Sequence, residues 1–226
     1  MKKFFYITLL IPLTYNLVYA GNVPWGIEFN GQAKYNFIEN SEQKHNYGGS
    51  LLFSYYINRL QVQTGLGLQS KNFTKTIQYN NDYIPAHYRI NYFSLIPIII
   101  NVPLGSFDKF GMYICGGLMI HHIFKYTINS KTDNTILAKN PDAGQHSSSS
   151  VRIGTVVLSK RNLLNFKIIT FAEYKILVDS YQDFTMGHFP QPNSFITIPQ
   201  DRFSIGIALG WEFCFSDAHG KGNKTD

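Results

Sequence analysis

The segment 202–215, RFSIGIALGWEFCF, divides its side chains into two chemically different sets at alternate positions. One set is large and apolar: Phe203, Ile205, Ile207, Leu209, Trp211, Phe213 and Phe215. The other set, from Ser204 to Cys214, is small or polar. Because successive side chains of a strand point to opposite faces, this pattern predicts a strand with one apolar face and one narrow, polar face. Bulky groups outside and small groups inside suit a closed barrel in lipid, whose interior has little room.

The same alternation recurs along the chain. We expect strands over 25–37, 47–57, 60–71, 90–102, 110–126, 151–158, 164–176 and 203–215. The segment 90–102 is apolar on both sides; there we place Ile96, Ile98 and Ile100 outward, Pro97 and Asn101 inward. Since proline removes a ladder donor, a bulge or break is expected at Pro97. The sequence thus predicts an all-β fold, an eight-stranded antiparallel up-and-down transmembrane barrel over residues 21–215.

The connections alternate in length. Short turns are expected at 58–59, 105–109 and 160–162, and longer polar loops near 38–46, 72–89, 127–149 and 177–201. Tight turns on one rim and long loops on the other are typical of a small outer-membrane barrel, with turns in the periplasm and loops outside the cell. Both chain ends are then expected in the periplasm.

Composition agrees with a membrane barrel. The chain is 44% hydrophobic and 15% charged, yet after residue 20 no apolar run approaches the length of a membrane-spanning helix. Residues 1–20 pair Lys2 and Lys3 with an apolar stretch and end in small residues, which indicates a signal peptide cut after Ala20. The remaining 18 Lys and Arg against 14 Asp and Glu are too mild an excess for a nucleic-acid partner. Residues 216–226 are expected to form a periplasmic tail.

Aromatic residues gather near the expected strand ends, as at the two interfaces of a membrane. The turn rim carries Trp25, Tyr55, Phe110, Trp211, Phe213 and Phe215, and the loop rim carries Tyr35, Phe37, Tyr47, Phe124, Tyr126 and Tyr174. Gly210, Phe213 and Phe215 also resemble the signal by which barrel-assembly machinery recognises a last strand, although SDAHGKGNKTD follows.

The mature chain resembles the small outer-membrane β-barrel proteins of the OmpA/OmpX type. Within that group, YFSLIPIIINVPLG followed by KFGMYICGGLMI resembles the proline-containing and Gly-Gly strands of the PorT-like family, with Leu95 where that family often has a carboxylate. The resemblance implies an integral outer-membrane protein. For the PorT-like family it also implies an association with protein secretion.

Charged residues on the inward faces predict two groups in the lumen. Closing the barrel makes the first and last strands neighbours, so Glu28, Glu212 and Lys167 are expected to meet near the periplasmic rim, with Gln61 and Gln63 nearby. Toward the outer rim we expect Lys34, Lys71, Lys125, Arg152 and Lys175 around one carboxylate, Glu173. Buried charges need partners, which favours a salt-bridged plug. A gated polar path or an anion-attracting vestibule is the alternative.

No catalytic, cofactor-binding or metal-binding set stands out. His121 and His122 are adjacent in a strand and point to opposite faces, so one metal ion cannot easily take both. We expect His121 inside the barrel, in the polar network, and His122 at the membrane interface. A lipid-modifying hydrolase with His122 and the run Ser147–Ser150 is an alternative, but no carboxylate is clearly placed to orient that histidine. Cys115 and Cys214 are expected as free thiols inside the barrel, with a bridge as the alternative.

The sequence therefore predicts a non-enzymatic outer-membrane barrel whose partners are the outer-membrane lipids and the barrel-assembly machinery. Apolar residues in the long loops suggest contact with an extracellular or secretion-system protein or, equally, loops that pack on one another. These residues are Tyr79, Tyr83, Ile84, Pro85, His87, Phe184, Met186, Phe189, Pro190 and Pro192. The rival fold is an exported, soluble, lipocalin-like barrel that binds an apolar ligand. That barrel would turn Leu209 and Trp211 inward.

Overall fold

The computed structural model describes residues 25–38, 40–57, 60–79, 82–106, 110–140, 147–159, 164–178, 184–185, 195–196 and 202–215. The expected leader, the C-terminal tail, the short turns 58–59 and 160–162, and the apolar residues Met186 to Pro192 lie outside these ranges. The strands are β1 (Trp25–Asn36), β2 (Ser41–Ile57), β3 (Leu60–Tyr79), β4 (Asp82–Ser106), β5 (Phe110–Ser130), β6 (Ile136–Asn140), β7 (Ser147–Ser159), β8 (Leu164–Val178), β9 (Phe184–Thr185), β10 (Phe195–Ile196) and β11 (Phe203–Phe215). Within the described ranges, no helix is long and apolar enough to span a membrane.

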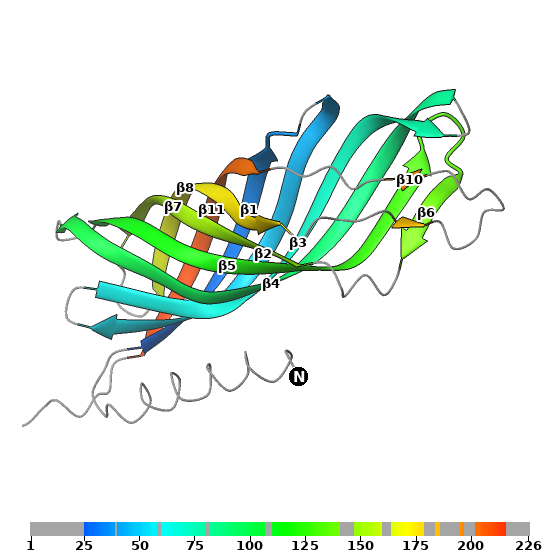
Figure 1. The fold of residues 1–226 in the computed structure, drawn as a ribbon. Coiled ribbons are helices and arrows are strands. Elements are labelled where there is room, and N and C mark those ends of the chain that lie inside the picture. Colours follow the sequence, from blue (N-terminus) through cyan, green and yellow to red (C-terminus); the bar gives the residue numbers. More distant parts are fainter. Residues whose placement is uncertain are drawn as a thin grey trace, which may run out of the picture.

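Eight of these strands close into a ring in the order β1-β2-β3-β4-β5-β7-β8-β11, and β11 pairs back onto β1 (Figure 1). Every pairing is antiparallel, and each strand lies beside its nearest neighbours in the chain except at the closure. The closing pair runs in unbroken register from Trp25 opposite Phe215 to Asn36 opposite Ser204. The predicted fold class, an eight-stranded up-and-down barrel, is confirmed.

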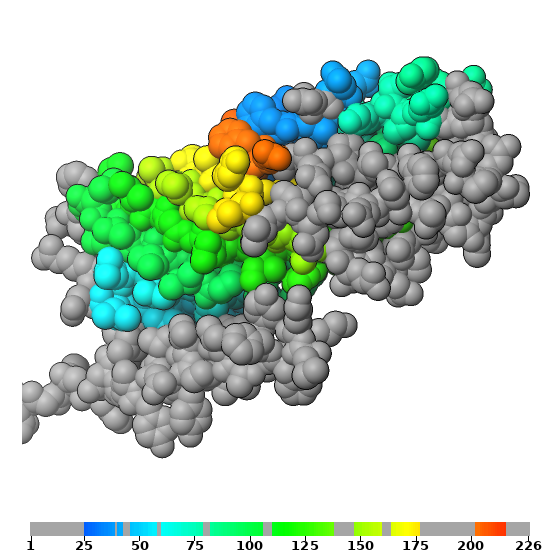
Figure 2. All heavy atoms as spheres, viewed as in Figure 1, coloured from blue at the N-terminus to red at the C-terminus, as the bar shows by residue number. Residues whose placement is uncertain are grey.

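The barrel has its bulky apolar groups outside and its charges inside. On β11, Leu209 and Trp211 are 42% and 45% exposed, whereas Glu212 between Trp211 and Phe213 is fully buried. The outer atoms of β5, β7 and β8 gather side by side into one surface along the barrel (Figure 2). In soluble proteins large apolar side chains fill the interior, so this arrangement needs an apolar medium around the wall.

Two bulges change which side chains face the lumen, and three predicted facings are wrong for this reason. In β4 the pairing with β5 skips between Leu95 and Ile98, so Ile96 is buried at 3% exposure although the alternation predicted it outward. In β5 the extra residue is Phe124, because Asn91 pairs with Lys125 while Tyr92 pairs with Ile123. Phe124 and Lys125 therefore both face outward, and Tyr126, predicted at the outer lipid interface, is buried. The bulge expected at Pro97 is present.

Strands β3, β4 and β5 continue well beyond the shorter strands and form a projecting sheet with β6 (Figure 1). The described parts of the segments 72–89 and 127–149, which were predicted as loops, are therefore mostly strand. One face of the projecting sheet has its own apolar cluster, in which Phe73, Tyr88, Ile90 and Ile128 are fully buried. The rings of Phe73 and Tyr88 stack with their centroids 4.7 Å apart. These strands are long because their far ends pack on this second core.

Candidate functional site

The first polar group in the lumen, here called the lower cluster, consists of Glu28, Glu212 and Lys167. Glu28 and Glu212 are directly opposite each other across the closing pair β1–β11, and Lys167 comes from the adjacent strand β8. The ammonium of Lys167 contacts Glu28 Oε2 and lies 3.0 Å from Glu212 Oε2. All three residues are at most 1% exposed. The barrel closure therefore brings two carboxylates together, and the lysine holds them.

Amide side chains from the opposite wall complete the lower cluster. Gln61 Nε2 donates to Glu212 Oε1 at 2.6 Å, and Gln63 Nε2 donates to Glu28 Oε2 at 2.6 Å. Asn101 Nδ2 donates to both glutamine oxygens, at 2.8 and 2.9 Å. Side chains from β1, β3, β4, β8 and β11 thus meet across the lumen, so the lower cluster ties the two sides of the ring together.

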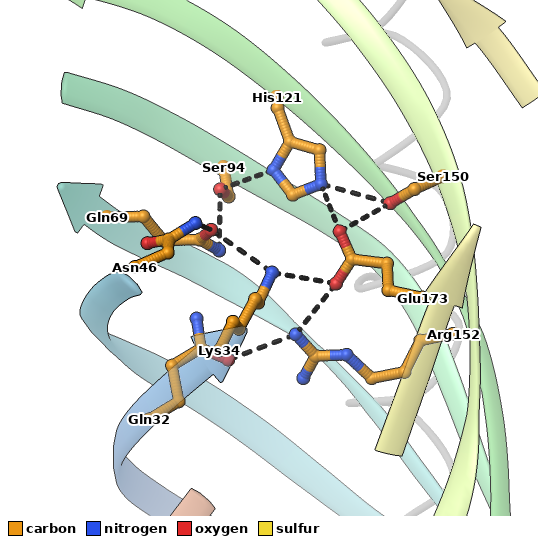
Figure 3. A network of polar contacts seen from close by, with 9 residues as sticks. All are labelled: Gln32, Lys34, Asn46, Gln69, Ser94, His121, Ser150, Arg152 and Glu173. Carbon is orange, nitrogen blue, oxygen red and sulfur yellow. Dashed lines mark hydrogen bonds and ion pairs between the residues drawn. The ribbon is translucent and has the colours of Figure 1, made fainter. Parts of the chain in front are cut away.

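The upper cluster consists of Glu173, Lys34, Arg152 and His121 (Figure 3). Glu173 Oε2 lies 2.7 Å from Lys34 Nζ and 3.2 Å from Arg152 Nη2, and Oε1 lies 2.9 Å from His121 Nε2. All four residues are at most 7% exposed. One carboxylate therefore accepts from two cations and an imidazole, which come from three other strands. Glu173 was expected among the cations and His121 in the interior polar network, and the contact between these two residues is new.

Uncharged side chains fix the orientation of the upper cluster. Ser150 Oγ donates to Glu173 Oε1 at 3.0 Å, and Ser94 Oγ lies 2.8 Å from His121 Nδ1. Because the carboxylate only accepts, His121 Nε2 carries a proton, and in the neutral ring Nδ1 accepts from the Ser94 hydroxyl. Gln69 links Ser94 to Lys34, with Nε2 donating to Ser94 Oγ at 3.2 Å and Oε1 accepting from Lys34 Nζ at 3.1 Å.

Three further lysines were expected in the lumen near the outer rim, and only two of them, Lys71 and Lys175, are there. Lys71 is 2% exposed and its ammonium lies 5.2 Å from the centre of the Phe73 ring. Lys71 and the half-buried Lys175 line a cavity of about 20 Å³ next to the upper cluster. Lys125 does not belong to the lumen at all, since the bulge at Phe124 turns it to the outer surface. The cavity has room for about one water molecule.

An apolar belt separates the lower and upper clusters, and the sequence analysis did not identify it. Its buried members are Leu52, Ile96, Ile99, Cys115, Met119, Val156, Ile169, Phe171 and Ala208. Phe171 closes the belt toward the upper cluster, because the guanidinium carbon of Arg152 lies 3.9 Å from the centre of its ring. The alternation could have revealed the belt, because Ile169 and Phe171 are odd-numbered residues of the same strand as Lys167 and Glu173 and therefore face the same side.

The belt leaves little space. A cavity beside Asn101, Cys115 and Arg152 has a volume of about 20 Å³, again room for about one water molecule. A larger depression of about 660 Å³ lies on the outer wall, lined by small side chains such as Ala33, Thr155 and Ala172. The described lumen thus carries charge at two levels, with apolar side chains between them.

The aromatic residues predicted for the turn-side interface stand on the outer surface. Trp25, Trp211, Phe213 and Phe215 are between 40% and 45% exposed. The rings of Trp25 and Phe215 stack across the closing pair, with centroids 4.4 Å apart. Toward the other rim, Tyr35 is 39% exposed and meets Phe37 edge to face at 5.2 Å.

Within the described ranges, no group of three or more His, Cys, Asp or Glu side chains could hold a metal ion. Cys115 and Cys214 are both free thiols. His121 is in the lumen, whereas His122 is half-buried on the outer face and lies directly opposite Ser147 on β7, which the sequence analysis placed in a loop.

No known family model and no curated protein matches this sequence, so membership of the PorT-like family stays a prediction. Its fold is similar to solved small outer-membrane β-barrel proteins. A major outer-membrane protein from Thermus thermophilus is 12% identical, with 84% of this chain and 99% of that chain covered and a TM-score of 0.48. Neisserial surface protein A is 8% identical, with 85% and 97% covered and a TM-score of 0.45. The attachment invasion locus protein Ail of Yersinia pestis is 12% identical, with 86% and 99% covered and a TM-score of 0.43.

Proposed function

We propose that this protein is a non-enzymatic, integral outer-membrane barrel that anchors a projecting sheet on the cell surface. The observation that carries the proposal is the inverted distribution of side chains. Leu209 and Trp211 stand on the outside while Glu28, Lys167 and Glu212 are buried inside. A barrel with this distribution is soluble in lipid and not in water.

The lumen serves the anchor by holding the ring shut. Each cluster joins strands from opposite sides of the barrel, and the apolar belt between them excludes a continuous column of water. Rings of charge conduct ions only where a wetted path connects them. A plug of fixed ion pairs therefore fits a structural role better than a pore.

The orientation follows from the unequal rims. Both ends of the described barrel, Trp25 and Phe215, are at the rim where β2 meets β3 and β4 meets β5 through short connections. We place this rim in the periplasm, as in small outer-membrane barrels, and the projecting sheet outside the cell. Outer-membrane lipids surround the wall, and the barrel-assembly machinery recognises β11 through Gly210, Phe213 and Phe215. The projecting sheet would present itself to an extracellular or secretion-system protein.

Two measurements test the membrane anchor. The protein should be extracted from cell envelopes only with detergent, and the folded form should migrate differently from the boiled form on a gel. Release with the soluble periplasm would contradict the proposal.

Surface labelling tests the orientation. In a background with Cys115→Ala and Cys214→Ala, a membrane-impermeant maleimide should label Thr132→Cys on intact cells, because Thr132 is exposed at the tip of the projecting sheet. Gly105→Cys, exposed at the opposite rim, should react only after the outer membrane is permeabilised. The reverse labelling pattern would overturn the orientation.

The soluble lipocalin-like alternative needs the opposite facing. It would require Leu209 and Trp211 to line a ligand cavity, but these side chains are on the outer wall. The described interior is occupied by the two charged clusters and the belt. An apolar ligand has no place there.

A lipid-modifying hydrolase is the second candidate, because His122 and Ser147 pair directly across β5 and β7 on the outer face. Glu173, the buried carboxylate of the upper cluster, contacts His121, the neighbour of His122 in the chain. If this pair is catalytic, the purified protein should release fatty acid from a phosphorylated glycolipid, and Ser147→Ala should abolish the release. Absence of release from the folded wild type would leave the anchor role alone.

A further inference from the structure

The bulge in β5 builds a basic patch on the outer wall, directly above the apolar band. Across β3, β4 and β5 the last row with large apolar side chains consists of Leu68, Phe93 and His122, which pair in that order. The next outward row toward the projecting sheet is Ser70, Asn91 and Lys125, and the one after is Asn72, Arg89 and Thr127. The wall therefore changes from apolar to polar within one row, and the first two polar rows each carry a cation.

Both cations are exposed on this wall, Arg89 on β4 and Lys125 on β5. Arg89 Nε donates to Asn72 Oδ1 at 3.3 Å, which holds the guanidinium against the sheet and leaves its two terminal nitrogens out of this bond. Without the extra residue Phe124, the alternation would turn Lys125 into the lumen, as the sequence analysis expected. The bulge is therefore what places the two cations on one face.

No carboxylate belongs to this part of the sheet. Residues 70–76 of β3, 85–91 of β4 and 125–129 of β5 contain neither Asp nor Glu. The nearby Glu42, on β2, is exposed and pairs with Lys131, with 3.0 Å between Oε2 and Nζ. The patch thus presents positive charge outward without an acidic partner from its own strands.

We propose that Arg89 and Lys125 bind the phosphate groups of a phosphorylated glycolipid in the outer leaflet of the surrounding membrane. The proposal rests on the proposed outer-membrane location and orientation. The head-group region on each side of a bilayer is roughly 5 to 8 Å thick. A strand rises about 3.3 Å per residue and barrel strands tilt by about 45°, so outward rows two residues apart are about 5 Å apart along the bilayer normal. Lys125 is then at head-group depth, and Arg89, about 9 Å above the last apolar row, is at its outer edge. Arginine offers several donors to a phosphate, and lysine adds a point charge. Leu68, Phe93 and Phe124 below would contact the acyl chains of the same lipid.

The test uses the full chain folded in neutral detergent micelles and titrated with lipid A that carries both phosphates, with bound lipid counted by native mass spectrometry. Each basic residue near an anionic membrane surface contributes about fivefold in affinity, or about 1 kcal/mol at 1.4 kcal/mol per tenfold. Arg89→Gln with Lys125→Gln should therefore weaken binding about 30-fold. The charge-retaining pair Arg89→Lys with Lys125→Arg should keep most of the affinity.

Three controls make the result specific. Lys131→Gln removes the same charge from the projecting sheet farther from the apolar band and should leave binding unchanged. Dephosphorylated lipid A should bind the wild type as weakly as the phosphorylated form binds the double variant. Inorganic phosphate at the lipid concentration should not compete, because it lacks the acyl chains.

The outcomes separate this inference from the proposed function. Equal binding by the wild type and the heat-modifiable, folded double variant would overturn the lipid site and leave the anchor intact. Equal losses in the double variant and Lys131→Gln would also overturn it, since the effect would then be one of net charge. If the wild-type protein neither enters micelles nor changes its gel migration on heating, the proposed membrane-anchor function itself is contradicted.

Discussion

At the residue scale, the upper cluster depends on one carboxylate. Glu173 accepts from Lys34, Arg152, His121 and Ser150, and every one of these side chains is buried. Removing one partner from a buried ion pair costs more than the pair contributes, because the remaining charges keep their desolvation penalty. The stability of the upper cluster is therefore concentrated in a single side chain.

We expect Glu173→Gln to lower the free energy of unfolding by about 3 to 5 kcal/mol, because Lys34 and Arg152 would lose their shared anion. Urea titration of the protein folded in micelles or vesicles measures this change. The matched control is Glu42→Gln, whose carboxylate is 73% exposed in its pair with Lys131 and which should cost less than about 1 kcal/mol. Equal effects of the two substitutions would contradict the importance of the upper cluster.

Lys167 has the corresponding place in the lower cluster. Lys167→Met leaves Glu28 and Glu212 facing each other without a cation, and we expect a loss of about 3 to 5 kcal/mol in the free energy of unfolding. Adding Glu28→Gln removes one of the facing charges and should restore part of that loss. The prediction fails if the double variant is no more stable than Lys167→Met in the same urea titration.

At the element scale, close packing between strands depends on where glycine stands. A Cβ at Gly206 on β11 would lie 2.5 Å from Cζ of Phe171 and 2.8 Å from the carbonyl oxygen of Ala33. The absence of a side chain at Gly206 therefore makes room for the ring that closes the apolar belt. At Gly31 on the outer face of β1, by contrast, an added Cβ would meet nothing within 4 Å.

Gly206→Ala should destabilise the barrel by about 1 to 3 kcal/mol, since the backbone oxygen of Ala33 cannot move away as a flexible side chain would. Gly31→Ala should be neutral within about 0.5 kcal/mol. Urea titrations of both variants give the comparison. A neutral Gly206→Ala would mean that Phe171 can leave the belt without cost.

Along the individual strands, the alternation of side chains predicts most inward and outward facings but not all of them. The facings of β1, β3 and β11 follow from parity because their inward and outward rows never shift over the barrel. Parity fails at Ile96 and Lys125, because a bulge inserts one residue and reverses every facing beyond it. Pro97 signals its bulge by lacking an N–H, whereas Phe124 has no such chemical mark. The contact between Glu173 and His121 was not predicted, because alternation shows which side chains face the lumen but does not give the register of β7 that brings β5 and β8 together at these residues.

At the scale of the whole molecule, the apolar belt decides whether the lumen conducts. Its members fill the section between two charged clusters, and the cavity within it holds about one water molecule. A hydrophobic constriction of this kind blocks ions by excluding water. We therefore expect the barrel to carry the charges of a channel without a wetted path.

The purified wild type should be silent in a planar bilayer. Met119→Gly together with Phe171→Gly removes two large side chains from the belt and should produce discrete current steps. Phe29→Gly, which removes a ring from the lipid-facing wall, should stay silent. Steady conductance in the wild type would contradict the closed lumen.

The pairing of β1 with β11 also has a consequence for biogenesis. Trp25 meets Phe215 at a seam that joins opposite ends of the described chain, so the cylinder cannot seal until nearly all of it has left the ribosome and crossed the inner membrane. Contacts between such distant partners form slowly, because a very large loop must be closed first. Until the barrel closes, the large apolar side chains on the outer face of β11 have no lipid around them. The unfolded chain would then need a periplasmic chaperone that covers this strand and prevents aggregation until the barrel inserts into the membrane.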